Sequence, residues 1–87
     1  MEKVNVYIIT YGPHRIPLEK ECIEKALESA KNCTNYDVQI YVCDNNSPPE
    51  FIDWAKELTK TEPKLAVYNH PENIGKARIV NLVHGQV

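Results

Sequence analysis

An apolar run of the chain ends abruptly in a carboxylate, two amides and a hydroxyl. The run is Val38–Cys43, and Asp44, Asn45, Asn46 and Ser47 follow it directly. In open parallel sheets, ligands bind in the crevice beyond the carboxyl ends of the strands. A carboxylate at such a strand end can accept hydrogen bonds from a base or a ribose. The pattern therefore indicates a nucleotide site.

Two further loops carry groups that a nucleotide needs. Thr10, Tyr11 and Arg15 follow an apolar run near the amino terminus, and Asn73 and Lys76 follow another near the carboxyl terminus. An aromatic ring can stack on a base, while cations and free backbone N–H groups bind phosphates. Lys76 is expected in the first turn of a helix, where a cation opposes the helix dipole and a bound anion would explain its presence.

Alternating strand and helix patterns position these three loops. Nearly continuous apolar runs favour strands covered on both faces, and apolar residues at steps of three and four favour amphipathic helices. The predicted strands are Val4–Thr10, Val38–Cys43 and Leu65–Tyr68, and the predicted helices are Pro17–Asn32, Pro48–Lys60 and Asn73–His84. Connections of this length force parallel pairing with right-handed crossovers. We expect an α/β fold, a βαβαβα half of a doubly wound, Rossmann-like sheet with strand order 3-2-1.

Local signals support two of these helices. Ser47, two prolines and Glu50 form a capping-box pattern, with Ser47 as the expected N-cap of the second helix. Leu18 and Cys22 belong to the apolar stripe of the first helix, so Cys22, like Cys43, is expected to be a small core residue rather than a metal ligand. Three cysteines without a paired spacing predict no disulfide framework, which fits a reducing compartment.

Length and composition bound the class of protein. The 87 residues predict one small domain spanning 1–87, with 43% apolar and 25% charged residues as in ordinary globular domains. A net charge of −2 argues against a nucleic-acid partner. Apolar stretches are only strand-length and no signal-peptide pattern is present, so we expect no membrane span and a cytoplasmic location.

Three segments in order resemble the amino-terminal, nucleotide-binding part of family 2 glycosyltransferases, which have the GT-A fold. In that family the first strand ends in Thr-Tyr or Thr-Phe, as in Thr10-Tyr11, with an arginine following, here Arg15. A second strand ends in Val-x-Asp-Asn/Asp-Gly-Ser, which Val42–Ser47 matches except that Asn46 replaces glycine. Asparagine tolerates the left-handed backbone that glycine would supply. The family's Asn-x-Gly-x-x-x-Ala-Arg-Asn segment resembles Asn73–Asn81, with Val80 where arginine is common.

The resemblance implies binding of a nucleoside diphosphate sugar, with a uridine base. It implies that Asp44 accepts a hydrogen bond from the base, that Thr10 and Tyr11 line the base pocket, and that Arg15 or Lys76 lies near the diphosphate. The implied nucleotide-binding residues are Thr10, Tyr11, Arg15, Asp44, Asn46, Asn73, Gly75 and Lys76.

Each of these residues also has a purely structural interpretation. Asp44 can cap the following turn, and Asn73 can cap a helix. Thr10 and Tyr11 can pack at a strand end, Gly75 can serve close packing, and Arg15 and Lys76 can be solvated surface cations.

The segment that would bind a metal in this family is missing from the sequence. Family members hold Mn²⁺ or Mg²⁺ with an Asp-x-Asp motif on a later strand and place a catalytic carboxylate later still, whereas these 87 residues contain no Asp-x-Asp. Leaving-group stabilisation and acceptor activation need such groups. We therefore expect no catalytic and no metal-binding residue here, and an inactive donor-binding part of a larger GT-A domain, whose metal belongs to the full-length enzyme.

The first strand also lies at an open sheet edge in the predicted order, and no proline, glycine or internal lysine blunts that edge. A later strand or a second copy of the chain can pair there, so self-association is possible. Two alternatives remain open: a stand-alone nucleotide-binding or protein-interaction module, and an unrelated flavodoxin-like or phosphate-binding α/β domain.

Overall fold

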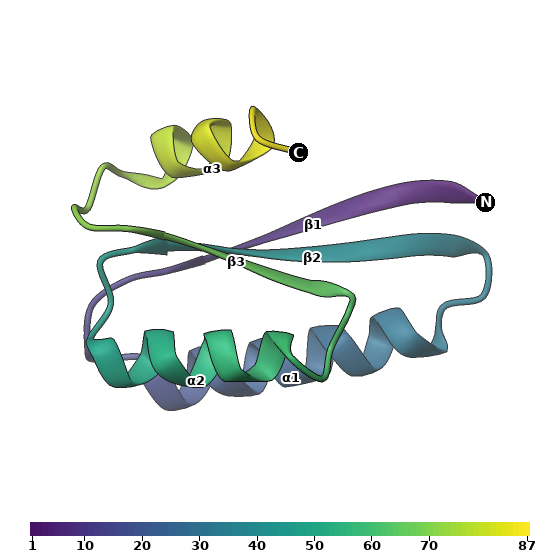
Figure 1. Cartoon of the computed structure of the whole chain (residues 1–87), viewed down its shortest axis with the longest axis horizontal. Coiled ribbons are helices and arrows are strands. Elements are labelled where there is room, and N and C mark those ends of the chain that lie inside the picture. The colour runs from purple at the N-terminus through teal and green to yellow at the C-terminus, as the bar shows by residue number, and fades with distance from the viewer.

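The computed structural model describes residues 1–87 as three strands and three helices that alternate along the chain (Figure 1). This arrangement confirms the predicted α/β class. The strands are β1 (Glu2–Thr10), β2 (Tyr36–Asn45) and β3 (Leu65–His70), and the helices are α1 (Ile16–Asn32), α2 (Pro49–Thr59) and α3 (Lys76–His84).

One parallel sheet holds the three strands in the order β1-β2-β3, so β2 is the central strand. In register, Thr10 of β1 pairs with Asp44 of β2, and Asp44 in turn pairs with Asn69 of β3. The carboxyl ends of all three strands therefore meet at one edge of the sheet, where the three candidate loops begin.

Helices cover both faces of this sheet. α1 and α2 lie below it in Figure 1 and α3 lies above it. Because side chains alternate along a strand, β2 sends Ile40 and Val42 into the core with α1 and α2, and sends Tyr41 and Cys43 into a second core with α3. The first core is the larger, with Ile23 and Phe51 fully buried at its centre.

Two helix starts differ from the predicted ones. α2 begins at Pro49 with Pro48 as N-cap, and the Ser47 side chain makes no capping bond, so the predicted capping box is wrong. Pro48 and Pro49 lack N–H groups that Ser47 could cap, and the carbonyl of Pro48 starts the helix instead. α3 begins at Lys76 rather than Asn73, because Gly75 has φ +87° and cannot continue a right-handed helix.

The outer edge of β1 is unpaired, and apolar side chains beside it are exposed. Leu18 is 63% exposed and Cys22 is also exposed, so the prediction that Cys22 is a core residue is wrong. Both residues belong to the apolar stripe of α1. This stripe extends past the edge of the three-stranded sheet, so the sheet does not cover all of it.

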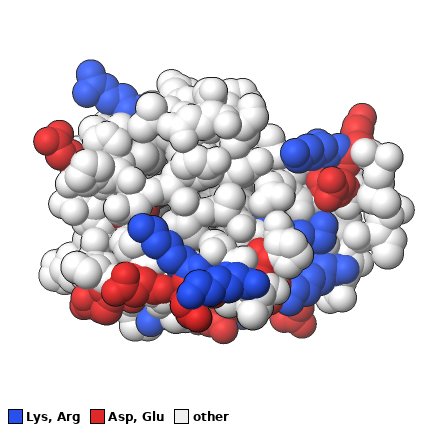
Figure 2. Space-filling view, in the orientation of Figure 1, with Lys and Arg blue, Asp and Glu red and all other residues white.

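Charged side chains gather mainly over α1 and α2, along the bottom of Figure 2, while the region around α3 is largely uncharged. None of the three helices combines the length and the apolar character that crossing a membrane requires.

Candidate functional site

Two neighbouring cavities open where the strands end. The smaller one has a volume of about 190 Å³. It is lined by Tyr11, Asn45, Asn73, Gly75 and Lys76. All three loops thus contribute to one hollow, and four of its five lining residues are among those implied from the sequence.

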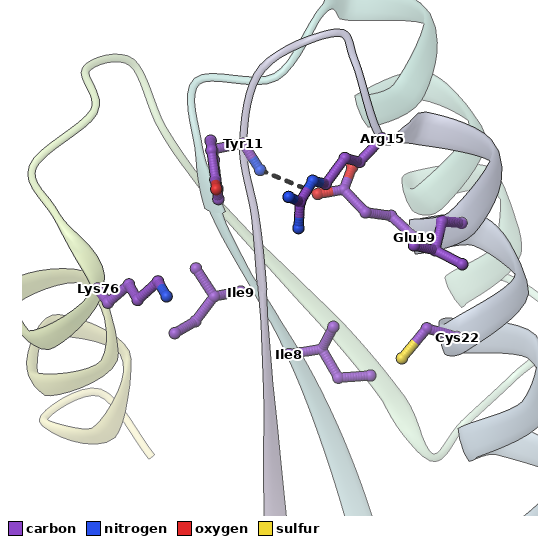
Figure 3. A pocket seen from close by; sticks show the side chains of 8 residues that line it. Ile8, Ile9, Tyr11, Arg15, Glu19, Cys22 and Lys76 are labelled. Carbon is purple, nitrogen blue, oxygen red and sulfur yellow. Dashed lines mark hydrogen bonds between the residues drawn. The ribbon is translucent and has the colours of Figure 1, made fainter.

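The larger cavity, of about 330 Å³, lies beside the outer edge of β1 (Figure 3). It shares Tyr11 and Lys76 with the smaller cavity and adds Arg15 and Glu19. Its other lining residues are apolar or weakly polar: Ile8, Ile9, Leu18 and Cys22. Two cations from separate elements, Arg15 before α1 and Lys76 in the first turn of α3, therefore border the same space as one aromatic ring.

Asp44 is fully buried and lines neither cavity. Its Oδ1 accepts a hydrogen bond from the Thr10 hydroxyl at 2.7 Å. Its Oδ2 accepts one from the Asn69 amide at 2.7 Å and one from the backbone N–H of Ser47 at 3.0 Å. The carboxylate thus joins all three strand ends, and three of about four acceptor positions are already used within the chain.

Asn45 was not among the residues implied from the sequence, yet it lines the smaller cavity. Its side-chain oxygen accepts the backbone N–H of Ile74 at 3.2 Å, which ties β2 to the loop before α3. The alternation of side chains along a strand could have identified Asn45 from the sequence. If Asp44 faces α1 and α2, Asn45 faces α3 and the third loop. The sequence analysis ended the strand at Cys43 and therefore did not apply this alternation to Asn45, whereas β2 continues through Asn45.

The loop before α3 is shaped by two of the implied residues. The Asn73 side chain accepts the N–H of Gly75 at 3.1 Å, and Gly75 adopts its positive φ immediately before the helix. No side chain caps α3. The first N–H groups of a helix have no partner within it, so they remain available beside Lys76 to bind an anion.

Asn46 lies apart from the other implied residues. It has φ +63°, the left-handed conformation expected for a residue in place of glycine. It borders a third cavity of about 340 Å³, together with Ser47 and Asn69. The structure therefore brings Tyr11, Arg15, Asn73, Gly75 and Lys76 together around two adjoining hollows. Thr10 and Asp44 are buried and line neither hollow, and Asn46 lies on another side.

Glu19 is a second residue of the site that the sequence patterns did not identify, because they place it on the solvent-exposed face of a helix. Its Oε2 accepts the backbone N–H of Tyr11 at 3.2 Å (Figure 3), and its Oε1 is buried without a partner. Burial raises the pKa of Glu19 above its usual value. The negative charge of Asp44 adds to this rise in the pKa, and the Tyr11 N–H and Arg15 oppose it.

No group of three or more His, Cys, Asp or Glu side chains lies close enough together to hold a metal ion. The acidic groups nearest the candidate site, Asp44 and Glu19, each use an oxygen to fix a backbone N–H.

Comparison with known protein families yields one match. The model of the glycosyl transferase family 2 matches residues 6–83, which include all three strands' carboxyl ends and every residue of the two adjoining cavities. No curated protein and no solved structure matches the chain.

Proposed function

Since the chain belongs to glycosyl transferase family 2, we propose that its two adjoining cavities bind the nucleoside diphosphate part of a sugar donor. The observation that carries this proposal is the meeting of Tyr11 and Arg15, from the loop after β1, with Lys76, at the start of α3, around one space. Because an aromatic face and two cations are the groups needed by a base and a diphosphate, the site chemistry agrees with the family.

We assign the base to the smaller cavity. Tyr11 is 42% exposed and can offer its ring for stacking, and Asn45 is the residue of β2 that lines this space. We propose uridine as the base, as the family resemblance implies. Asp44 and Thr10 are fully buried and line neither cavity, so we assign them the role of holding the strand ends that carry Tyr11 and Asn45.

The diphosphate is assigned to the side where Arg15 and Lys76 border the larger cavity. The uncapped start of α3 adds free N–H groups, which Gly75 leaves open because nothing lies within 4 Å of the place where a Cβ would be. Asn73 holds this turn in shape. The role of Asn46 is conformational: its left-handed backbone turns β2 toward α2.

We propose that these residues form the donor-binding portion of a larger catalytic domain and do not transfer a sugar by themselves. Transfer needs a group that stabilises the departing diphosphate and a base that activates the acceptor hydroxyl. Arg15 and Lys76, which border the larger cavity, can contribute to the first need, and we assign no residue to the second.

Calorimetric titration with UDP tests the proposal directly. We expect weak binding with little dependence on Mn²⁺ or Mg²⁺, because the chain offers no metal-binding cluster. Lys76→Ala should weaken binding about tenfold, since it removes a charge-assisted contact of about 1.4 kcal/mol. Arg78→Ala is the matched control: Arg78 is an exposed cation two residues later on α3 and borders neither cavity.

Equal losses in Lys76→Ala and Arg78→Ala would show that only general positive charge attracts the ligand. Tight, metal-dependent binding by the chain would contradict the incomplete-site proposal. Asp44→Ala should abolish binding. Asp44→Asn keeps one acceptor oxygen, so comparing UDP binding by the two variants separates loss of the ligand site from loss of the fold.

The open edge of β1 supports a second proposal, that two copies of the chain associate there. Leu18 and Val4 are exposed beside this unpaired strand, at 63% and 38%. Unpaired edges bind further strands unless charge or proline blunts them. Sedimentation velocity should show dimers at high protein concentration, and the Val4→Lys variant should remain monomeric at that concentration. A strict monomer of the parent chain would contradict this proposal.

The three free thiols support the further proposal of a cytoplasmic location.

A further inference from the structure

We propose that Glu19 couples nucleotide binding to the uptake of one proton: its carboxylate holds the Tyr11 loop in place and becomes neutral when a diphosphate enters the adjoining cavity. The inference rests on the proposed function, because it concerns the anion that the site would bind. It goes further in naming a residue and a charge state on which affinity depends.

The first step is the position of Glu19. It lies in the first turn of α1 and reaches back to accept the Tyr11 N–H, so it bridges the helix and the loop that presents Tyr11 and Arg15. Its Oε1 is buried and unpartnered. A buried carboxylate oxygen without a donor is costly while the group is ionised. A neutral carboxyl avoids the larger cost of a buried charge and still accepts the Tyr11 N–H through its carbonyl oxygen.

The second step is the balance of charge around the cavity. The charges that act on Glu19 are those of Arg15 before α1 and Asp44 from β2, while Lys76 from α3 lines the same cavity. A diphosphate held by Arg15 and Lys76 brings negative charge into the cavity that Glu19 lines. Protonation of Glu19 removes the repulsion between its carboxylate and that diphosphate.

Glu19 rather than Asp44 is the group that takes the proton. Asp44 accepts three hydrogen bonds, all of which favour its ionised form. Glu19 accepts one bond and is desolvated, which raises its pKa before any ligand arrives. An incoming anion raises the pKa of Glu19 further, so binding and protonation favour each other.

The sign of the pH dependence follows from this coupling. The affinity is highest at low pH, where Glu19 is neutral in the free and the bound protein. It falls as pH rises from the pKa of the free protein to that of the complex, by at most about tenfold per pH unit for one proton.

Titration calorimetry with UDP-glucose and with uridine tests this coupling between pH 4.5 and 8. The diphosphate of UDP-glucose does not itself titrate in this range, so protons taken up belong to the protein. Two buffers with different ionisation enthalpies give the number of protons bound. We expect uptake approaching one proton with UDP-glucose and none with uridine, which lacks phosphate.

Glu19→Gln should eliminate the uptake and make UDP-glucose binding independent of pH, while its amide oxygen still accepts the Tyr11 N–H and preserves the fold. Glu28→Gln, an exposed change on the same helix, should behave like the parent chain. UDP-glucose binding without proton uptake, or uptake that survives in Glu19→Gln, would overturn the role of Glu19 and leave the proposed function intact. Failure of both ligands to bind at every pH would overturn the proposed function itself, and this inference with it.

Discussion

Thr10 and Asp44 are paired in register across β1 and β2, and the Thr10 hydroxyl donates to Asp44 Oδ1 at 2.7 Å with both residues fully buried. A carboxylate removed from water in this way is stable only when donors surround it. Asn69 and the Ser47 N–H complete that set. The pair therefore fixes the relative position of the strand ends on which all three loops depend.

Replacing Asp44 with alanine should lower the free energy of unfolding by about 3 kcal/mol, because it leaves two buried donors and the part-buried Asn69 amide without their acceptor. The total stability of a domain is only about 5–15 kcal/mol, so this loss is large. Urea unfolding followed by circular dichroism measures it. Asp44→Asn should lose less, since its one amide oxygen keeps an acceptor.

Asp37→Asn is the control for that experiment. Asp37 is exposed and forms a 3.4 Å surface ion pair with Lys64, which contributes at most about 1 kcal/mol. A loss in Asp44→Ala no larger than that in Asp37→Asn would show that the Asp44 hydrogen bonds do not hold the strand ends.

Ser47→Ala should leave the stability nearly unchanged, within about 0.5 kcal/mol. A serine that caps a helix loses about 1 kcal/mol on this substitution, but the buried Ser47 hydroxyl has no partner to lose. Thermal or urea unfolding distinguishes the two results. A loss above 1 kcal/mol would restore the capping box that the sequence predicts and the structure does not show.

Ser47 also shows where sequence reasoning stops. The capping-box pattern depends only on residue types. The position of Ser47 in the folded chain depends instead on Asp44, which accepts the Ser47 backbone N–H and draws the turn toward the strand. Such a tertiary bond leaves no periodic signal. Class, element order and parallel pairing were predictable, because they follow from apolar runs and connection lengths.

The candidate site was predictable in part for the same reason. Tyr11 directly follows β1, and Lys76 ends the loop that follows β3, so the two converge because parallel strands end together. Asn45 and Glu19 were missed because each needs a bond from another element, to Ile74 and to Tyr11, to become part of the site. Cys22 was misplaced because burial of α1 requires a wider sheet than three strands provide.

The contrast between Ile23 and Leu18 tests that explanation of α1. Ile23 is fully buried against β2 and α2, so Ile23→Ala should lose about 3 kcal/mol of stability. Leu18 belongs to the same apolar stripe but is 63% exposed, so Leu18→Ala should lose less than about 0.5 kcal/mol. Equal losses in urea unfolding would mean that the edge of β1 is covered in solution.

The three cysteines should react with a thiol reagent in a fixed order. Cys22 is exposed, Cys33 is partly buried, and Cys43 is fully buried between the sheet and α3. Burial raises the pKa of the Cys43 thiol to about 11, so its reactive thiolate is scarce at neutral pH even when local opening admits reagent. Mass spectrometry after iodoacetamide treatment at pH 8 should find Cys22 alkylated first and Cys43 last.

Alkylation of Cys43 should approach the rate of Cys22 only in denaturant, where burial and the raised pKa are both lost. Rapid labelling of Cys43 in the folded protein would show that α3 separates from the sheet, and with it Lys76 and the phosphate side of the site.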